Sequence, residues 1–215
     1  MNDEISKLSY KLGGRISKEA MLDKNVNLEL PVYISPGVEI ATNCFIGKYT
    51  FINKNVIIYK NVEIGKYCSL GRNCEIGLSS HPTNFLSTHL FQVKDNELFI
   101  RSEGNNKLLK QDWIKHRKVS IGSDVWIGAK VSIMNGISIG HGTIVGANSL
   151  VTKDVEPYSI IAGSPAKFIR KRFSDKIINE LLLLKWWELD IKDLGDINFS
   201  NINECIDKLS LFRSR

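Results

Sequence analysis

The sequence lacks any apolar stretch long enough to cross a bilayer. Its opening residues, MNDEISKLSYKLGG, include early acidic residues and lack the apolar core of a signal peptide. Cysteine is scarce, with 4 residues in 215, and no CxxC pair occurs. We therefore expect a cytoplasmic protein with no membrane insertion, whose cysteines stay reduced.

Positive charge is only modestly in excess: the formal net charge is +6 at pH 7, and 24% of the residues are charged. Such an excess suits a partner that carries phosphates but does not by itself indicate nucleic acid. The sequence also lacks a zinc pattern, a recognition helix and a basic stretch interleaved with aromatic residues. We expect no nucleic-acid partner. The length is sufficient for a buried core without disulfide or metal support.

What the sequence does have is an internal repeat of six residues. Leucine, isoleucine or valine occupies every sixth position in two runs separated by a break. The first run is Leu22, Leu28, Ile34, Ile40, Ile46, Ile52, Ile58, Ile64, Leu70 and Ile76, and the second is Ile121, Ile127, Ile133, Ile139, Val145 and Val151. A period of six fits neither an α-helix nor an ordinary strand. It indicates a solenoid with three flat faces and about eighteen residues in each coil.

A second series follows the first in step, four residues after each aliphatic residue, and its members are mostly small or β-branched. They are Val26, Val32, Val38, Cys44, Thr50, Val56, Val62, Cys68, Cys74 and Ser80, then Val125, Val131, Ile137, Thr143, Ser149 and Val155. We expect these side chains near the corners, where little room is available. The three cysteines of the series are therefore predicted to be buried structural thiols. Cys205 lies outside the repeat.

The predicted fold is all-β: a parallel β-helix with an excursion loop and a C-terminal α-helical extension. The aliphatic residues fill the prism, and glycines such as Gly47, Gly65 and Gly71 are expected to ease the turns between faces. Sixteen hexads correspond to about five coils. The predicted units are an N-terminal cap over 1–20, the β-helix over 21–156 with an excursion loop over 81–118, and a C-terminal loop and helical tail over 157–215.

The tail changes its periodicity from six to that of a helix. Ile177, Leu181, Leu184 and Trp187 are three or four residues apart, which predicts an amphipathic helix. We expect this helix to pack over the open end of the β-helix, or on a neighbouring subunit, because an open solenoid end exposes unpaired strand edges. Residues 1–20 are expected to cover the other end.

The break between the two runs contains the strongest candidate for chemistry. It opens with SSHPTNFLSTHLF, so His81 follows Ser80, the last small position of the first run. This places His81 at a corner where the chain leaves the coil. An excursion this long from a regular solenoid is usually functional. Of the other histidines, His89 and His116 lie in the loop, and His141 replaces a turn residue of the repeat.

Several segments resemble the hexapeptide-repeat acetyltransferases, whose β-helix is left-handed. They are SSHPTNFLST, VSIGSDVWIGAKVSIMNGISIGHGTIVGANSLVTKDV, IIAGSPAKFIRKRF and FSDKIINELLLLKWWEL. The resemblance covers roughly Leu22 to Trp187. The most similar branch contains the xenobiotic acetyltransferases, which act on chloramphenicol and streptogramins, and the related sugar and polysaccharide O-acetyltransferases. It implies a left-handed parallel β-helix and acetyl-CoA as the acetyl donor.

The resemblance also implies how the reaction proceeds. A histidine on the excursion loop acts as general base in this family, and it corresponds to His81. An imidazole takes up and releases a proton near neutral pH, so it can deprotonate a hydroxyl or amine that attacks the thioester. Because the acceptor attacks directly, no protein nucleophile is needed, and buried cysteines would make a covalent acyl-enzyme unfavourable.

The second run corresponds to the family's CoA groove. Small residues there let an extended ligand approach the main chain, and basic residues meet the phosphates. The corresponding positions are Trp126, Ala129, Ala147, Thr152, Lys153, Lys167 and Arg170. Without the resemblance, the alanines could be ordinary packing and the basic residues a solvated face that includes Lys171 and Arg172. Trp126 could lie beside the cofactor and acceptor, against a neighbouring subunit, or both.

The acceptor is less well indicated. Ser87, Thr88 and Phe91 match an STxxF element of the xenobiotic enzymes, but QVKDNELFIRSEGNNKLLKQDWIKHRK departs from them. We therefore favour O-acetylation of a sugar hydroxyl, in surface-polysaccharide synthesis. A chloramphenicol or streptogramin acceptor and N-acetylation of an amino-sugar nucleotide remain alternatives. Asn84 and Trp113 are the candidate acceptor contacts.

The resemblance implies a homotrimer in which His81 of one subunit and the Trp126 region of the next form three composite sites. Two rival functions remain. A zinc enzyme on this fold needs three converging histidines, and only His81 and His141 lie on or beside coils, so no metal site is expected. A non-catalytic β-helix scaffold is the other alternative, although it would not need Lys153, Lys167 and Arg170 alongside His81.

Overall fold

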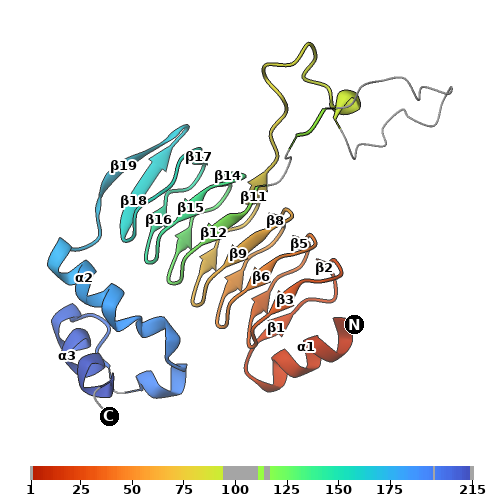
Figure 1. The fold of residues 1–215 in the computed structure, drawn as a ribbon. Helices are drawn as coiled ribbons and strands as arrows, with labels where there is room; N and C mark the ends of the chain where they lie inside the picture. Colours follow the sequence, from red (N-terminus) through yellow and green to blue (C-terminus); the bar gives the residue numbers. More distant parts are fainter. Residues whose placement is uncertain (1, 94–110, 114–116, 196, 214–215) are drawn as a thin grey trace.

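In a computed structural model, the protein is described over residues 2–93, 111–113, 117–195 and 197–213. Short parallel strands wind into a three-sided β-helix, as the hexad repeat predicts (Figure 1). Sheet A contains β1 (Arg15–Ile16), β4 (Tyr33–Ile34), β7 (Phe51–Ile52), β10 (Ser69–Leu70), β13 (Trp126–Ile127), β16 (Ile144–Val145), β18 (Ser159–Gly163) and β19 (Ala166–Lys171). Only β18 and β19 pair antiparallel among the described strand pairs.

The other two sheets complete the triangle. Sheet B contains β2 (Met21–Leu22), β5 (Glu39–Ile40), β8 (Ile57–Ile58), β11 (Glu75–Leu78), β14 (Ser132–Met134) and β17 (Leu150–Val151). Sheet C contains β3 (Asn27–Leu28), β6 (Phe45–Ile46), β9 (Val62–Ile64), β12 (Val119–Ile121) and β15 (Ser138–Ile139). The chain passes from A to B to C, so the prism has A/B, B/C and C/A corners. The stack of parallel strands begins with β1 and continues to β18. The β-helix therefore extends further at both ends than the five predicted coils.

The aliphatic series fills the interior of the prism, which confirms the predicted core. From Ile34 to Ile76 every member is at most 2% exposed, whereas Leu22 and Leu28 at the open end are half-buried. Val125, Val131 and the predicted cysteines are buried as well. Each cysteine of the series donates its thiol to a carbonyl of the next coil, as Cys68 Sγ does to Gly122 O at 3.1 Å. Burial raises the pKa of Cys68 to about 12.

The glycines at the corners have a different role from the predicted one of easing the turns between faces. Gly47, Gly65 and Gly71 have no positive φ. That conformation falls on the residue before most of the small positions, such as Asn73 (φ 57°). Asparagine tolerates the left-handed region because its short polar side chain bonds locally. The glycines are needed instead because coils stack too closely for a side chain. A Cβ on Gly47 would lie 2.6 Å from the carbonyl carbon of Gly65.

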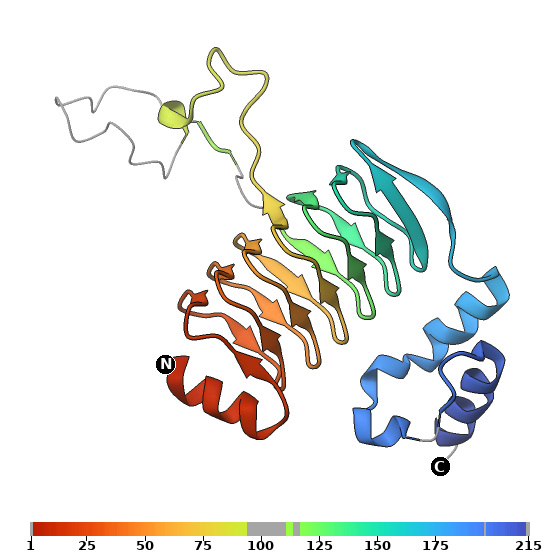
Figure 2. The same cartoon turned by 180° about the vertical axis from the view of Figure 1, so that it is seen from behind.

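Helices occupy the two ends of the chain. They are α1 (Asn2–Lys11), α2 (Asp175–Leu184) and α3 (Ile202–Arg213), with 3₁₀ turns η1 (Leu90–Gln92), η2 (Trp186–Glu188) and η3 (Ile191–Leu194). Helix α1 lies at the N-terminal end of the prism (Figure 2), where Ser9 Oγ donates to Val32 O at 3.0 Å. None of the helices in the described ranges combines the length and apolar character of a membrane span.

The C-terminal extension was expected to pack over the open end of the β-helix or on a neighbouring subunit, but within the described residues it does not cover that end. It turns back and lies along the C/A corner (Figures 1 and 2). Lys48 Nζ on that corner bonds Asp190 Oδ2 at 2.6 Å, and Tyr67 Oη donates to Leu189 O at 2.8 Å. Helix α2 also ends earlier than predicted, because Lys185 adopts a left-handed conformation (φ 44°) that closes the last turn. Trp187 therefore belongs to η2.

Candidate functional site

The chain leaves the β-helix directly after β11 (Figure 1). Because β11 belongs to sheet B and the next strand, β12, to sheet C, His81 lies at the B/C corner. His81 is exposed, and its Nδ1 is 2.8 Å from the backbone oxygen of Thr88. Because a carbonyl oxygen can only accept, Nδ1 carries the proton in the neutral ring. The other ring nitrogen, Nε2, is then the basic one. The excursion thus orients the histidine as a general base requires.

The two predicted acceptor residues are placed differently. Trp113 lies beside the start of the excursion, where its indole Nε1 donates to Ser80 O at 3.2 Å. Its ring meets Phe85 edge-on, with 5.9 Å between centroids. Asn84 is exposed near the same turn of chain. Trp113 therefore holds the residue that precedes His81, in addition to any contact with an acceptor.

The remaining histidines are engaged elsewhere or lie outside the described residues. His89 Nδ1 accepts from Phe91 N at 3.1 Å and caps η1. His141 Nδ1 accepts from Ser123 N at 2.8 Å, and its ring stacks on Trp187 with 4.3 Å between centroids. Burial lowers the pKa of His141, which favours the neutral ring in that contact. His116 lies outside the described residues.

Small residues line the A/B corner along the second run of coils. A Cβ on Gly71 would lie 2.5 Å from Ala129 N, and a Cβ on Gly128 would lie 2.6 Å from Ala147 N. Ala147 is exposed and Ala129 half-buried. Successive coils therefore present main chain with little side-chain cover at this corner. We call this stripe of Gly71, Gly128, Ala129, Gly146 and Ala147 the small-residue corner.

The predicted phosphate contacts gather at the C-terminal end of the β-helix. Lys153 follows β17, while Lys167 and Arg170 lie on β19, and all three are exposed. Thr152 and Lys153 line a hollow of about 410 Å³ beside the hairpin that β18 and β19 form. The structure separates these residues from the rest of the basic run, which is engaged in ion pairs.

Two neighbouring basic residues are paired and so do not form a solvated face with the others. Lys171 Nζ is 2.7 Å from Glu156 Oε2, and Arg172 Nη1 is 2.9 Å from Asp124 Oδ2. The Lys171 ammonium holds the pKa of the Glu156 carboxyl below its usual range.

Trp126 lies on sheet A with its side chain 55% exposed. Sheet A is the face opposite the B/C corner, where His81 leaves the prism. A single chain therefore does not bring His81 and Trp126 together. Neither residue is on the face that carries the groove described next.

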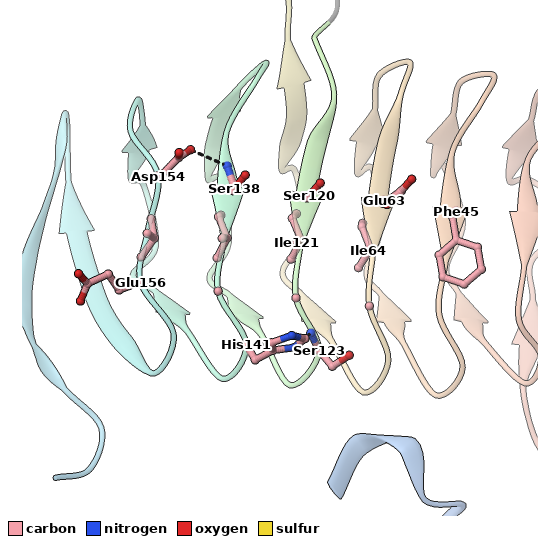
Figure 3. A pocket seen from close by; sticks show the side chains of 15 residues that line it. Phe45, Glu63, Ile64, Ser120, Ile121, Ser123, Ser138, His141, Asp154 and Glu156 are labelled. Carbon is pink, nitrogen blue, oxygen red and sulfur yellow. Dashed lines mark hydrogen bonds between the residues drawn. The ribbon is translucent and has the colours of Figure 1, made fainter. Parts of the chain in front are cut away.

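A groove of about 490 Å³ runs along the outer face of sheet C (Figure 3). Its carboxylates are already engaged: Glu63 Oε1 is 2.7 Å from Lys118 Nζ, and Asp154 Oδ1 accepts from Ser138 N at 2.8 Å. None of the predicted site residues lines it. Within the described residues no cluster of three or more His, Cys, Asp or Glu side chains could hold a metal.

One contributor to the site has no signal in the sequence. The group that orients His81 is the Thr88 carbonyl, and every residue type has such a carbonyl. Only the path of the excursion, which brings Thr88 back to His81, makes it the partner. The STxxF element marks the segment but not this role.

A family model described as bacterial transferase hexapeptide (six repeats) matches residues 43–78 and 118–153. Chloramphenicol acetyltransferase of Escherichia coli is 54% identical over 76 residues, which cover 35% of this chain and 36% of the relative. A probable macrolide acetyltransferase of Lysinibacillus sphaericus is 57% identical over 76 residues, 35% of this chain and 42% of that protein. The chain thus matches less than half the length of these curated relatives.

The fold also has a solved counterpart. The hexapeptide-repeat-containing acetyltransferase VCA0836 of Vibrio cholerae, solved with acetyl coenzyme A, has a TM-score of 0.52 and 24% identity. The alignment covers 81% of this chain and 79% of that one. The likeness establishes the left-handed parallel β-helix.

Proposed function

We propose that this chain is a hexapeptide-repeat acetyltransferase that uses acetyl-CoA as donor and His81 as general base, and the matches over 43–78 and 118–153 support the proposal. The observation that carries the proposal is the hydrogen bond between His81 Nδ1 and the Thr88 carbonyl. It leaves Nε2 to take a proton from an acceptor hydroxyl as the hydroxyl oxygen attacks the acetyl carbonyl. The proton then passes from Nε2 to the departing thiolate.

Direct attack by the acceptor fits the chemistry of the rest of the chain. All 4 cysteines are buried free thiols, and burial raises the pKa values of Cys44, Cys68, Cys74 and Cys205. A thiol that is hard to deprotonate is a poor nucleophile. A covalent acyl-cysteine is therefore disfavoured, and a base that activates the acceptor is sufficient.

Acetyl-CoA is proposed to lie along the small-residue corner, with its phosphates at the hairpin of β18 and β19. Main chain that is free of large side chains at Ala129 and Ala147 suits an extended pantetheine arm. The exposed Lys153, Lys167 and Arg170 supply positive charge at the C-terminal end of the β-helix. These cations suit phosphate groups, Arg170 through a planar fork and the lysines as point charges.

We propose that three copies of the chain assemble to complete three sites. An outward column on sheet A is largely apolar, and strand pairing places its members in one row: Tyr33, Phe51, Ser69, Trp126, Ile144 and Ile160. Such a row on an exposed sheet favours cover by a second copy. Because Trp126 is opposite the B/C corner of its own chain, His81 must meet the donor groove of a neighbour.

The acceptor is proposed to be an alcohol. The sequence favours a sugar hydroxyl in surface-polysaccharide synthesis. The identities to chloramphenicol and macrolide acetyltransferases favour a hydroxyl of an antibiotic as the second candidate. In either case the same base and the same donor groove serve the reaction, because both acceptors lose a proton from oxygen.

Release of free thiol from acetyl-CoA tests the proposal with sugars, nucleotide-sugars, chloramphenicol, a macrolide and a streptogramin as acceptors. His81→Gln keeps a donor for the Thr88 carbonyl but cannot accept a proton, so we expect kcat to fall about 10²- to 10⁴-fold. His89→Ala is the matched control, because His89 lies in the same loop but caps a local turn; it should retain kcat within about threefold. Equal turnover by wild type and His81→Gln would refute His81 as the base.

A further inference from the structure

A separate cavity of about 280 Å³ lies between the C-terminal extension and the C/A corner. Most of its wall is apolar and comes from the extension, including Leu181, Trp186, Leu194 and Phe199. Phe199 is 68% exposed at the edge of this cluster, whereas Leu181 is 3% exposed. An apolar cavity with a few polar groups at one end is the usual form of a small-molecule site. It is remote in the fold from His81, which lies at the B/C corner, along the other edge of sheet C.

The polar end of the cavity contains an unsatisfied hydroxyl. Tyr158 is 1% exposed. Its Oη makes no hydrogen bond of ordinary geometry with the described residues, although the Trp186 side chain is near enough to oppose the rise in its pKa. A buried donor without an acceptor costs free energy, so native structures rarely keep one without a bound group to satisfy it. Burial raises the pKa of Tyr158, as does the charge of Asp124. The hydroxyl therefore keeps its proton and remains a donor.

The neighbouring charges determine what kind of ligand fits. Arg172 Nη1 donates to Asp124 Oδ2 at 2.9 Å and to Gly142 O at 2.7 Å, and its guanidinium lies 5.3 Å from the centroid of the Tyr158 ring. Arginine and aspartate thus balance each other at this end of the cavity. A charged ligand would gain no net attraction and would lose its hydration.

We propose that this cavity binds an uncharged, mainly apolar small molecule that presents one oxygen acceptor to the Tyr158 hydroxyl. An aryl ketone has this chemistry: an aromatic ring for the apolar wall and one carbonyl oxygen for the donor. The ligand would contact the corner and the extension at once, so it would also hold the extension on the β-helix.

Acetophenone is the probe, and isopropylbenzene has nearly the same shape without the acceptor. Titration of the full chain, followed by NMR of the Trp186 indole N–H, should show acetophenone binding about 2- to 10-fold more tightly than isopropylbenzene. Tyr158→Phe should abolish this preference while isopropylbenzene binds as before. Tyr10→Phe is the matched control, because Tyr10 is 76% exposed on α1, and it should keep the preference.

A second measurement guards against a misfolded variant. Because the hydroxyl of Tyr158 makes no hydrogen bond of ordinary geometry within the described part of the ligand-free chain, Tyr158→Phe should melt at or above the wild-type temperature. A lower melting temperature would show that the hydroxyl is already satisfied and would overturn the proposal. So would an absence of binding by acetophenone, or equal binding of the two probes by wild type.

Discussion

Replacing Gly47 by alanine tests whether close stacking of the coils, and not turn geometry, requires the corner glycines. An added Cβ would lie 2.6 Å from Gly65 C and 2.7 Å from Lys66 N. Ordinary van der Waals contact begins at 3.4 Å, so the two coils must separate by about 0.8 Å locally (3.4 − 2.6). The atoms that collide are backbone atoms fixed by the parallel ladder, so they cannot move aside as a flexible side chain would.

The cost follows from these contacts. Overpacking of this kind costs about 1–3 kcal/mol, and alanine recovers about 0.4–1 kcal/mol by restricting the unfolded chain. The net loss of about 1–2 kcal/mol should lower the melting temperature by about 2–8 °C for a chain of this length. If glycine served the turn through a positive φ instead, asparagine would be tolerated at Gly47, because the corners already contain asparagines in that conformation.

Differential scanning calorimetry and urea unfolding of Gly47→Ala and Gly47→Asn would measure the loss. Gly195→Ala is the control, because its Cβ would meet only Lys192 O at 3.7 Å, an ordinary contact, and its φ is −56°. That variant should be as stable as wild type or up to about 1 kcal/mol more stable. The reasoning fails if Gly47→Ala melts within about 1 °C of Gly195→Ala, or if Gly47→Asn is the more stable of the two Gly47 variants.

Two other predictions concern pH and assembly. Burial lowers the pKa of His141, so its contribution to stability is complete above the ordinary value of about 6.5 and is lost as pH falls through the lowered value. Urea unfolding at pH 7.5 and 5 should thus show a larger loss for wild type than for His141→Asn, which keeps an acceptor for Ser123 N without titrating; equal losses would contradict this. For assembly, refolding His81→Ala with Ala147→Trp, each inactive alone, should restore about a quarter of wild-type turnover, because one in four composite sites is intact. No recovery would place His81 and the donor groove in the same subunit.

The repeat made the β-helix predictable because each coil obeys the same local constraint. An inward aliphatic residue every sixth position, followed by a small residue four places later, leaves few other folds in which Ile34 to Ile76 are all buried. The break in the repeat also located His81, because a chain that leaves a regular solenoid must do so at a corner. The coil material at β1 was missed although Ile16 lies six residues before Leu22, in phase with the series. The material at β18 was missed because Ile161 lies ten residues after Val151, out of phase with it.

The extension was predicted less well. Spacing identified an amphipathic helix near α2, but not where the helix ends or which surface it covers. The left-handed Lys185 ends α2, and the contacts of Asp190 with Lys48 and of Trp187 with His141 direct the extension to the C/A corner. The partners in these contacts are about 140 and 46 residues apart in the sequence (190 − 48 and 187 − 141), and no local pattern records such pairings.

The sequence by itself determined the period, the inward faces and the place of the excursion, because these depend on which side chains lie six residues apart. Only the tertiary structure decided that the corner glycines serve coil stacking and that the Thr88 carbonyl orients His81. It alone also showed that the buried Tyr158 hydroxyl makes no hydrogen bond of ordinary geometry with the residues described. Each of these depends on the distance between backbone or side-chain atoms of separate coils and loops. Such distances follow from how the coils stack and how the loop and tail return, and residue identity alone does not fix them.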